Sequence, residues 1–527
     1  MSPVRYKVFL ACWLAFIAGA CSRAQVTTSQ YDNQRTGASL SETTLTPRNV
    51  HPRQFGRLFT LRVDGDVYAQ PLFLRGVEIP GKGRHDVLIV ATEHDSIYAF
   101  DANGNPRTPL WQVSLMRDGA TSLNEGDTDC FFIRPEVGIT STPVIDAGTG
   151  TLYVLDRTKT GNKASDLHEQ LHALAVTTGA EKFGGPIEIR ALVRGRGDGS
   201  SNSTVAFDPL TENPRAALLL ANGIVYLSWA SSCDVGPYHG WIMAYDAHTL
   251  KQKGVYNDSP DADDGGIWAS DTGIAADKAG NIYAATGNGR FDAASGGRDY
   301  GDTLLKLGLS AAGLHLADYF TPFNADELNA HDNDLGSGGP MLLPDQPGPH
   351  PHLLIVGGKA PLLYVLDRDH LGHFHAGSNS HAVQTIVTKG GIFGSTAYWN
   401  HNVYVLSDSD NLRDYRVADG KLIFKAASSF RLQDHAATPV VSAHGTVNGI
   451  VWVLSSKGWD SPDRNAVLHA VDASNVAHEL YNSEQNSARD RAGVALRFNM
   501  PLVANGHVYT AAKREVDVYG LLTGGGN

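Results

Sequence analysis

The stretch LLIVGGKAPLLYVLDRDHLG (353–372) contains the pattern that decides the fold: an apolar strand, a polar break, and a second apolar strand that ends on aspartate. The pattern recurs along the 527 residues at intervals of roughly 50 to 75 residues. The second strands of the eight copies begin near Ile97, Leu171, Ile242, Leu304, Leu363, Arg413, Leu468 and Val516. Each copy is long enough for four short strands, and no stretch has sustained helical periodicity. The sequence therefore predicts an all-β fold, an eight-bladed β-propeller.

The last copy predicts how the ring closes. PLVANGHVYTAAKREVDVYGLL (501–522) is followed only by the tail 523–527, so this blade lacks a fourth strand. QFGRLFTLRV (54–63) is a strand left over before the first blade. We expect it to complete the eighth blade and remove an exposed edge. The propeller then covers 54–522, after an N-terminal extension over 21–53 and before a flexible tail over 523–527.

The N-terminus has the pattern of a signal peptide over residues 1–20. Arg5 and Lys7 precede an apolar run that is too short to cross a bilayer, and small residues follow it. Ala18-Gly19-Ala20 before Cys21 allows either ordinary cleavage or lipid attachment at Cys21. We expect an exported protein, periplasmic or extracellular, with no transmembrane segment in the mature chain. The net charge of −12 argues against nucleic acid as a partner.

Two of the four cysteines remain after the signal peptide and its cleavage site: Cys130 and Cys233. In an oxidising compartment they are expected to form a disulfide, and two buried free thiols are the alternative. No Cys-x-x-Cys-His motif occurs, so no c-type haem is expected. The histidines of PGPHPHLL (347–354) are irregularly spaced, which favours solvated side chains over a metal site.

Polar residues follow the earlier strand of several copies, as in VYLSWASSCD, IYAATGNG and LLIVGGKA. Equivalent strands of a propeller point the same way, so their terminal loops gather on one face. We therefore expect Ser231, Asp234, Asn288 and Lys359 to converge around one mouth of the ring. The alternative for each is an ordinary turn residue. Glycines beside Asn288 and Lys359 allow backbone or ligand to approach closely.

These segments resemble those of the quinoprotein alcohol dehydrogenases of the methanol dehydrogenase type, over nearly the whole mature chain. Members of that family are eight-bladed propellers that hold pyrroloquinoline quinone (PQQ) and calcium on the axis. GGIWASDTGIAADKAGNIYAATGNG (265–289) resembles the family stretch with a tryptophan beneath PQQ and an asparagine on calcium. The resemblance implies that Trp268 stacks on the quinone and that Asn288 binds the metal. The alternative for Trp268 is a core residue within a blade.

Three further segments carry the resemblance. WASSCDVGPYHGWIMAYD (229–246) implies Ser231 as a contact of the quinone and Asp234, in place of a glutamate, as a calcium ligand. HDNDLGSGG (331–339) implies Asp334 as catalytic base and metal ligand, with Asp332 as the alternative. LLIVGGKA (353–360) implies that Lys359 hydrogen-bonds the quinone oxygens and assists catalysis.

The chain also departs from the family pattern. The family's two adjacent cysteines are missing, because Phe131 follows Cys130. Arg134 is expected to bind a carboxylate of PQQ.

Three functions are compatible with these observations. The first is a PQQ- and calcium-dependent dehydrogenase that oxidises an alcohol or sugar hydroxyl and passes electrons to an external carrier such as a cytochrome. The second is a non-catalytic binding or scaffold propeller, favoured by the missing cysteine pair and the altered His-Asp segment. The third is a carbohydrate-active propeller that needs no cofactor.

Overall fold

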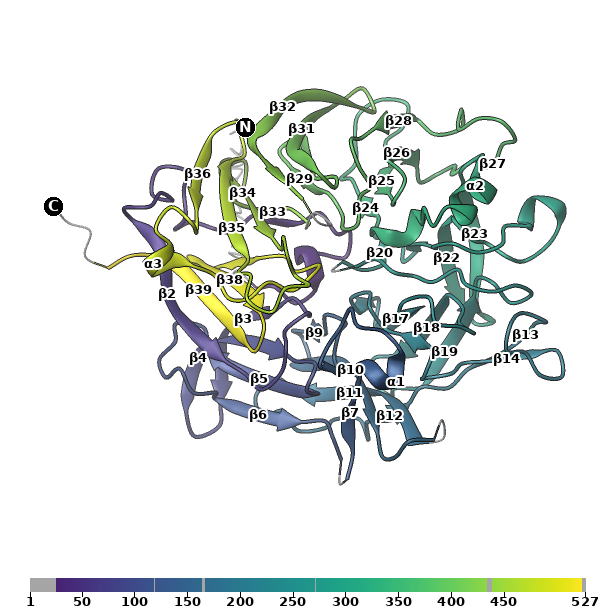
Figure 1. The fold of residues 1–527 in the computed structure, drawn as a ribbon, viewed down its shortest axis with the longest axis horizontal. Coiled ribbons are helices and arrows are strands. Elements are labelled where there is room, and N and C mark those ends of the chain that lie inside the picture. The colour runs from purple at the N-terminus through teal and green to yellow at the C-terminus, as the bar shows by residue number, and fades with distance from the viewer. Residues whose placement is uncertain (1–24, 118, 164–165, 271, 434–437, 524–527) are drawn as a thin grey trace, which may run out of the picture.

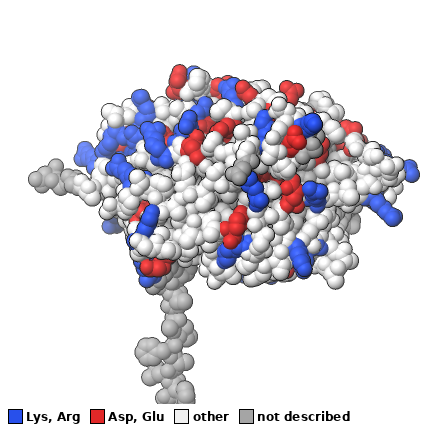
Figure 2. Space-filling view, turned by 90° about the horizontal axis from the view of Figure 1, so that it is seen from below, with Lys and Arg blue, Asp and Glu red and all other residues white. Residues whose placement is uncertain are grey.

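Eight small β-sheets surround a central axis in the computed structural model, so the expected eight-bladed propeller is confirmed (Figure 1). The structure describes residues 25–117, 119–163, 166–270, 272–433 and 438–523. The expected signal peptide and Cys21 lie outside these residues, as does most of the expected tail. Figure 2 shows the ring from its rim, where lysine and arginine side chains are mixed with acidic ones, mostly in the upper part of the view.

The strands of a blade follow one another from the axis to the rim (Figure 1). The first blade consists of β3 (Leu72–Ile79), β4 (Gly83–Ala91), β5 (Ser96–Asp101) and β6 (Trp111–Ser114), and the second of β9 (Val144–Asp146), β10 (Thr151–Lys159), β11 (Leu167–Ala175) and β12 (Ile187–Glu188). The third blade consists of β16 (Leu219–Ala221), β17 (Ile224–Ser231), β18 (Trp241–Asp246) and β19 (Gln252–Asn257), and the fourth of β20 (Ala275–Ala276), β21 (Ile282–Ala285), β22 (Leu304–Ser310) and β23 (Gly313–Thr321). The fifth blade consists of β24 (Met341–Leu342), β25 (Leu353–Gly357), β26 (Leu362–Asp367) and β28 (Gln384–Val387), and the sixth of β29 (Ala397–Trp399), β30 (Asn402–Val405), β31 (Asp410–Ala418) and β32 (Lys421–Leu432). The seventh blade consists of β33 (Val440–His444), β34 (Val447–Ser455), β35 (Val467–Asp472) and β36 (Glu479–Asn482), and the eighth of β37 (Leu502–Ala504), β38 (His507–Ala512), β39 (Glu515–Leu521) and β2 (Phe55–Arg62).

Shorter elements extend the blades or connect them. The remaining strands are β1 (Ala38–Ser39), β7 (Thr121–Asn124), β8 (Glu136–Val137), β13 (Leu192–Arg194), β14 (Thr204–Ala206), β15 (Glu212–Asn213) and β27 (His373–Phe374). The helices are α1 (Glu125–Thr128), α2 (Ala325–Ala330), α3 (Ser487–Asp490) and the 3₁₀ turns Ser29–Tyr31, Ala293–Ser295 and Leu335–Ser337. None of the helices in the described ranges has the length and apolar character needed to cross a membrane.

The hydrophobic core is divided among the blades. Apolar residues on both faces of each sheet pack against the neighbouring blades, because every blade is enclosed between two others. Between the second and third blades, for example, Tyr153, Trp229 and Trp241 are almost completely buried in one cluster. This packing explains why the strands of the sequence are nearly continuous apolar runs rather than strict alternations.

The ring is closed by the N-terminal strand, as the sequence predicts. β2 pairs antiparallel with β39, from Phe55 opposite Leu521 to Arg62 opposite Glu515. The fourth strand of the eighth blade therefore comes from the other end of the propeller. Every blade is then a complete sheet, and the last one has no open edge at β39.

Residues 26–37 run along the inner ends of the blades and touch all eight (purple, at the centre of Figure 1). The chain pairs with β3 through Val26 and Phe73 at its start and with β33 through Ala38 and Val441 at its end. Between these pairings the fully buried Arg35 donates hydrogen bonds to the carbonyl oxygens of Leu218 and Ile274. Part of the expected N-terminal extension is thus an internal plug of the axial channel.

Candidate functional site

A cavity of about 490 Å³ lies at one end of the axis. Its lining comes from two kinds of segment: residues that precede the innermost strand of a blade, such as Trp268 before β20, and residues that follow the second strand, such as Lys359 after β25. First and second strands are antiparallel, so these two kinds of segment meet at the same end of the ring. The plug contacts the innermost strands further along, so it lies below the cavity.

Four residues predicted from the sequence line this cavity together: Asp234, Trp268, Asp334 and Lys359. Asn288 lies beside them, since its amide group donates a 2.8 Å hydrogen bond to the cavity residue Asp332.

Two of the predicted residues lie elsewhere. Ser231 is completely buried at the end of β17, and its hydroxyl has no hydrogen-bond partner among the described residues. Arg134 is exposed and donates a hydrogen bond to the carbonyl oxygen of Asp460 instead of lining the cavity.

Gly287 explains why a buried strand ends on Thr-Gly-Asn-Gly. A Cβ atom at this position would collide with the carboxylate of Asp334 and lie only 2.6 Å from the indole nitrogen of Trp268. Glycine therefore lets the backbone after β21 approach both side chains. The Trp268 indole nitrogen is buried and has no hydrogen-bond partner among the described residues. Tyr238 packs edge-on against the ring at 6.3 Å.

Lys359 connects the two aspartates that the sequence left as alternatives. Its ammonium group lies 2.5 Å from a carboxylate oxygen of Asp332 and 2.5 Å from one of Asp334. The Asp332 side chain is 68% exposed, whereas that of Asp334 is 2% exposed, so the two carboxylates have very different environments. The other Asp334 oxygen accepts a 2.7 Å hydrogen bond from the backbone N–H of Asn288.

These environments shift the pKa values of Asp334 and Lys359. Burial raises the pKa of Asp334, and the adjacent Lys359 offsets part of that rise. Burial alone would lower the pKa of Lys359, but the carboxylates of Asp334 and Asp332 reverse the direction and raise it. The charged form of the buried Asp334 carboxylate is thus stabilised by Lys359 and by the backbone N–H of Asn288.

The structure offers some oxygen atoms that could bind a metal ion, but it does not bring them together as a complete set of ligands. The side-chain oxygen of Asn288 is buried without a partner among the described residues. Asp302, which the sequence analysis missed, is also buried: it accepts from Leu335 through one carboxylate oxygen and leaves the other without a described partner. Asp234 accepts a 3.1 Å hydrogen bond from Tyr238. Across the described ranges, no group of three or more His, Cys, Asp or Glu side chains is placed to hold a metal ion.

Cys130 and Cys233 form a disulfide, with 5.5 Å between their Cα atoms and a separation of 103 residues in the chain. Helix α1 leads into this bond; its first turn is stabilised by reciprocal hydrogen bonds between Asn124 and Asp127. Cys233 lines the cavity together with Phe131 and Phe132. The disulfide therefore fixes an aromatic loop at the mouth of the cavity to the loop after β17.

Two arginines that no motif identified also line the cavity: Arg215 and Arg497. The Arg215 guanidinium carbon lies 5.5 Å from the centre of the Trp268 ring, and that of Arg497 lies 4.1 Å from the Trp459 ring. Both precede the innermost strand of a blade, β16 and β37 respectively. That position, shared with Trp268, is the signal by which a sequence analysis could have found them.

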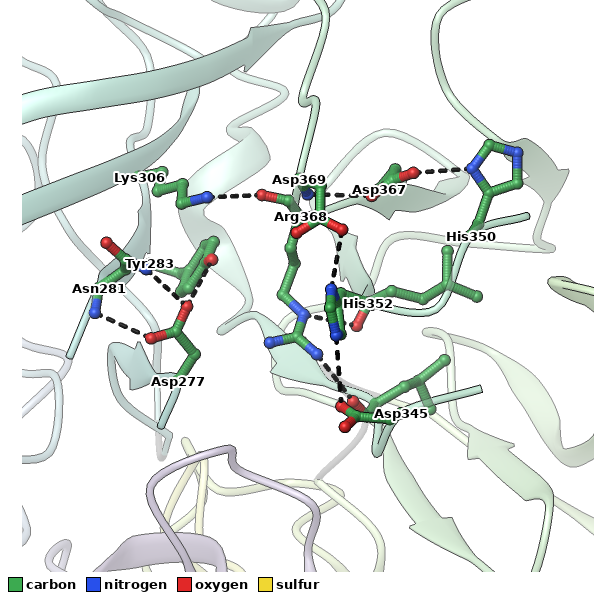
Figure 3. Close-up of polar contacts among 12 residues, drawn as sticks. Asp277, Asn281, Tyr283, Lys306, Asp345, His350, His352, Asp367, Arg368 and Asp369 are labelled. Carbon is green, nitrogen blue, oxygen red and sulfur yellow. Dashed lines mark hydrogen bonds and ion pairs between the residues drawn. The ribbon is translucent and has the colours of Figure 1, made fainter. Parts of the chain in front are cut away.

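His350 and His352, just before β25 of the fifth blade, each form a hydrogen bond with an aspartate (Figure 3). His350 lies 2.7 Å from Asp367, and His352 lies 2.8 Å from Asp369. Both histidine side chains are about two-fifths exposed, and none of these four residues lines the cavity. The loop therefore has paired surface histidines that are apart from the site.

No protein-family model matches this sequence, and no curated protein matches it either. Among solved structures, a quinohemoprotein alcohol dehydrogenase from Pseudomonas putida HK5 is similar at 13% identity and a TM-score of 0.64, over 95% of this chain and 81% of the other. A europium-containing methanol dehydrogenase has 13% identity and a TM-score of 0.62, over 94% of this chain and 98% of the other. BamB from Moraxella catarrhalis matches at 12% identity and a TM-score of 0.48, over 88% and 99% of the chains. The chain thus has the eight-bladed propeller fold of the quinohemoprotein and methanol dehydrogenases.

Proposed function

We propose that the cavity binds PQQ and a calcium ion, and that the protein oxidises a hydroxyl group of an alcohol or sugar. The observation that carries this proposal is that Asp234, Trp268, Asp334 and Lys359 line one cavity, with Asn288 beside them. These residues lie in separate stretches of sequence that resemble segments of the quinoprotein dehydrogenases. Their meeting at one end of the ring supports that resemblance beyond the fold.

Different residues would bind the quinone and the calcium ion. The indole of Trp268 offers a flat apolar face to a planar ligand, and Gly287 leaves room beside it. Lys359 would donate hydrogen bonds to the quinone oxygens. The unpartnered side-chain oxygen of Asn288, together with Asp334 and Asp234, would provide the hard oxygen ligands that calcium prefers.

When bound, PQQ supplies a two-electron acceptor and calcium supplies a Lewis acid that polarises it. Asp334 would accept the proton of the substrate hydroxyl as general base. The backbone N–H of Asn288 holds that carboxylate in place, and burial, by raising its pKa, makes it a better proton acceptor. Electrons would leave to an external carrier such as a cytochrome, because the chain has no haem-attachment motif of its own. The disulfide is consistent with an exported protein.

The test is a titration of the purified protein with PQQ and Ca²⁺, followed by absorption spectra, melting temperature and dye-linked oxidation of a panel of alcohols and sugars. Saturable binding and turnover are expected. Trp268→Ala should weaken PQQ binding about tenfold or more, whereas Trp111→Ala, outside the cavity, should not. Asp334→Asn should lower kcat by about 100-fold or more while PQQ still binds. Absence of both binding and turnover in the folded wild-type protein would reject the proposal.

A second candidate is a propeller that binds a partner without a cofactor. It is favoured by the bridging of Asp332 and Asp334 by Lys359, which already neutralises the expected catalytic carboxylate. The same titration separates the two functions. A folded protein that ignores PQQ but recovers one stable partner from a periplasmic extract would support this second function.

A further inference from the structure

Arg215 and Arg497 are cations that the proposed oxidation does not use. Arg497 is only 6% exposed, lines the cavity, and has a side-chain Nε without a hydrogen-bond partner among the described residues. In the part of the chain that the structure describes, neither guanidinium group lies within ion-pair distance of a carboxylate. A buried guanidinium without a counter-charge is costly unless a ligand supplies one.

Aromatic rings hold both guanidinium groups in place. Arg497 lies 4.4 Å from the ring centre of Phe132 and 4.7 Å from that of Phe498. Phe498 also faces Arg215 at 5.3 Å, so one ring lies against both cations. Its backbone has φ of 62°, a left-handed conformation that is strained for a bulky side chain. Strain of this kind concentrates at ligand-binding sites.

The charges around the pair leave it short of negative charge. Burial lowers the pKa of Arg497 to about 9, and the nearby Arg215 acts in the same direction. The carboxyl groups of Asp234 and Glu93 act on Arg215, and that of Asp460 acts on Arg497, in each case from beyond ion-pair distance. The remaining cavity carboxylates, Asp332 and Asp334, are bound to Lys359.

We propose that Arg215 and Arg497 form a subsite for the carboxylate group of an aromatic acid. A guanidinium group can donate two parallel hydrogen bonds to a carboxylate, and hydrogen bonds to charged groups are strong where water is excluded. The rings of Phe131, Phe132, Phe498 and Trp268 supply the apolar wall that a planar ring requires. The subsite defines a ligand class for the cavity, and the proposal stands whether that carboxylate belongs to PQQ or to a substrate.

The probe is 2-naphthoate, with the neutral 2-naphthylmethanol as its matched analogue, each titrated calorimetrically into the full protein. The acid is expected to bind at least about tenfold more tightly than the alcohol. Arg497→Leu and Arg215→Leu should each weaken binding of the acid about tenfold or more and leave the alcohol unchanged. Arg298→Leu is the control, because Arg298 pairs with Asp261 and does not line the cavity.

Equal affinity of the wild-type protein for acid and alcohol would overturn the proposal, and this comparison needs no variant. Unchanged binding of the acid in both leucine variants would also overturn it. Arg497→Lys keeps the charge but loses the planar group, so it should bind the acid with intermediate affinity if a leucine variant fails to fold. Competition by PQQ assigns the subsite to the cofactor, and simultaneous binding assigns it to the substrate. If PQQ fails to bind while naphthoate binds, the proposed oxidation fails and the subsite remains.

Discussion

At the scale of single residues, Glu93 shows how burial near the cavity changes the protonation of a carboxyl group. It follows β4, so it lies at the cavity end of the ring, and it is completely buried. One carboxylate oxygen accepts hydrogen bonds from Gly138 and Thr140, and the other has no described partner. Burial raises the pKa of Glu93 to about 8.

This pKa predicts a pH dependence of stability. Between its ordinary pKa and about 8, the folded protein keeps the Glu93 proton that the unfolded chain loses. The folded state binds more protons in this window, so the free energy of unfolding falls as pH rises, with a slope of up to about 1.4 kcal/mol per pH unit. Glu93→Gln removes this contribution. Denaturant unfolding of the variant from pH 5 to 9 should therefore show a flatter pH profile.

Glu78→Gln, at an exposed position of β3, is the control and should keep the wild-type profile. A Glu93→Gln variant with an unchanged slope would show that the carboxyl titrates normally in the folded state.

The sequence could identify residues whose roles depend on short local patterns. Trp268, Asp334 and Lys359 stand in recognisable segments, and all three line the cavity. Arg215 and Arg497 stand in no such segment, because aromatic rings that they contact come from loops far apart in the chain. Arg134, expected to bind a carboxylate of PQQ, is exposed and donates a hydrogen bond to the carbonyl oxygen of Asp460. Long-range packing, rather than local pattern, decides which arginines line the cavity.

At the scale of elements, strand β2 determines whether the ring is closed. Leu61 is completely buried in the cluster between the eighth and first blades, whereas the next residue, Arg62, is exposed and pairs with Glu515. Leu61→Ala should lower the free energy of unfolding by about 2–5 kcal/mol, through lost burial and the cavity left behind. Arg62→Ala, the control on the same strand, should cost no more than about 1 kcal/mol. Thermal or urea unfolding measures both, and equal losses would argue that β2 does not close the ring.

The strand could be predicted because its apolar pattern matches a strand missing from the last copy. The plug over residues 26–37 could not, because it has no repeated pattern of its own. Its hydrogen bonds run to backbone groups such as those of Phe73 and Val441, which any sequence could offer. Only the assembled channel creates a place for this segment.

At the scale of the whole molecule, the disulfide links the segment before β9 of the second blade to the loop after β17 of the neighbouring third blade, at the wall of the cavity. Replacing both Cys130 and Cys233 by serine opens a loop of 103 residues in the unfolded chain. The free energy of unfolding should fall by about 2–5 kcal/mol. Ligands of the cavity should also bind more weakly, since Phe131 is no longer held at the mouth. Reduction of the wild-type protein should reproduce both effects, and unchanged stability under either treatment would contradict this role.

The architecture of the molecule was predictable because eight copies of one pattern encode it redundantly. The function was less predictable than the architecture, because it depends on a few side chains around the axis and on loops without motifs. Even the described residues with the right chemistry, Asp332, Asp334 and Lys359, are paired with one another. Which reaction these residues support depends on the ligand that the cavity binds, and the sequence does not encode the identity of that ligand.

The most direct test is a crystal structure of the full protein prepared with PQQ and Ca²⁺ in excess. We expect planar density in van der Waals contact with the Trp268 indole, at about 3.5–4 Å, with an edge toward Lys359. An empty cavity under these conditions, or quinone bound elsewhere on the ring, would contradict it.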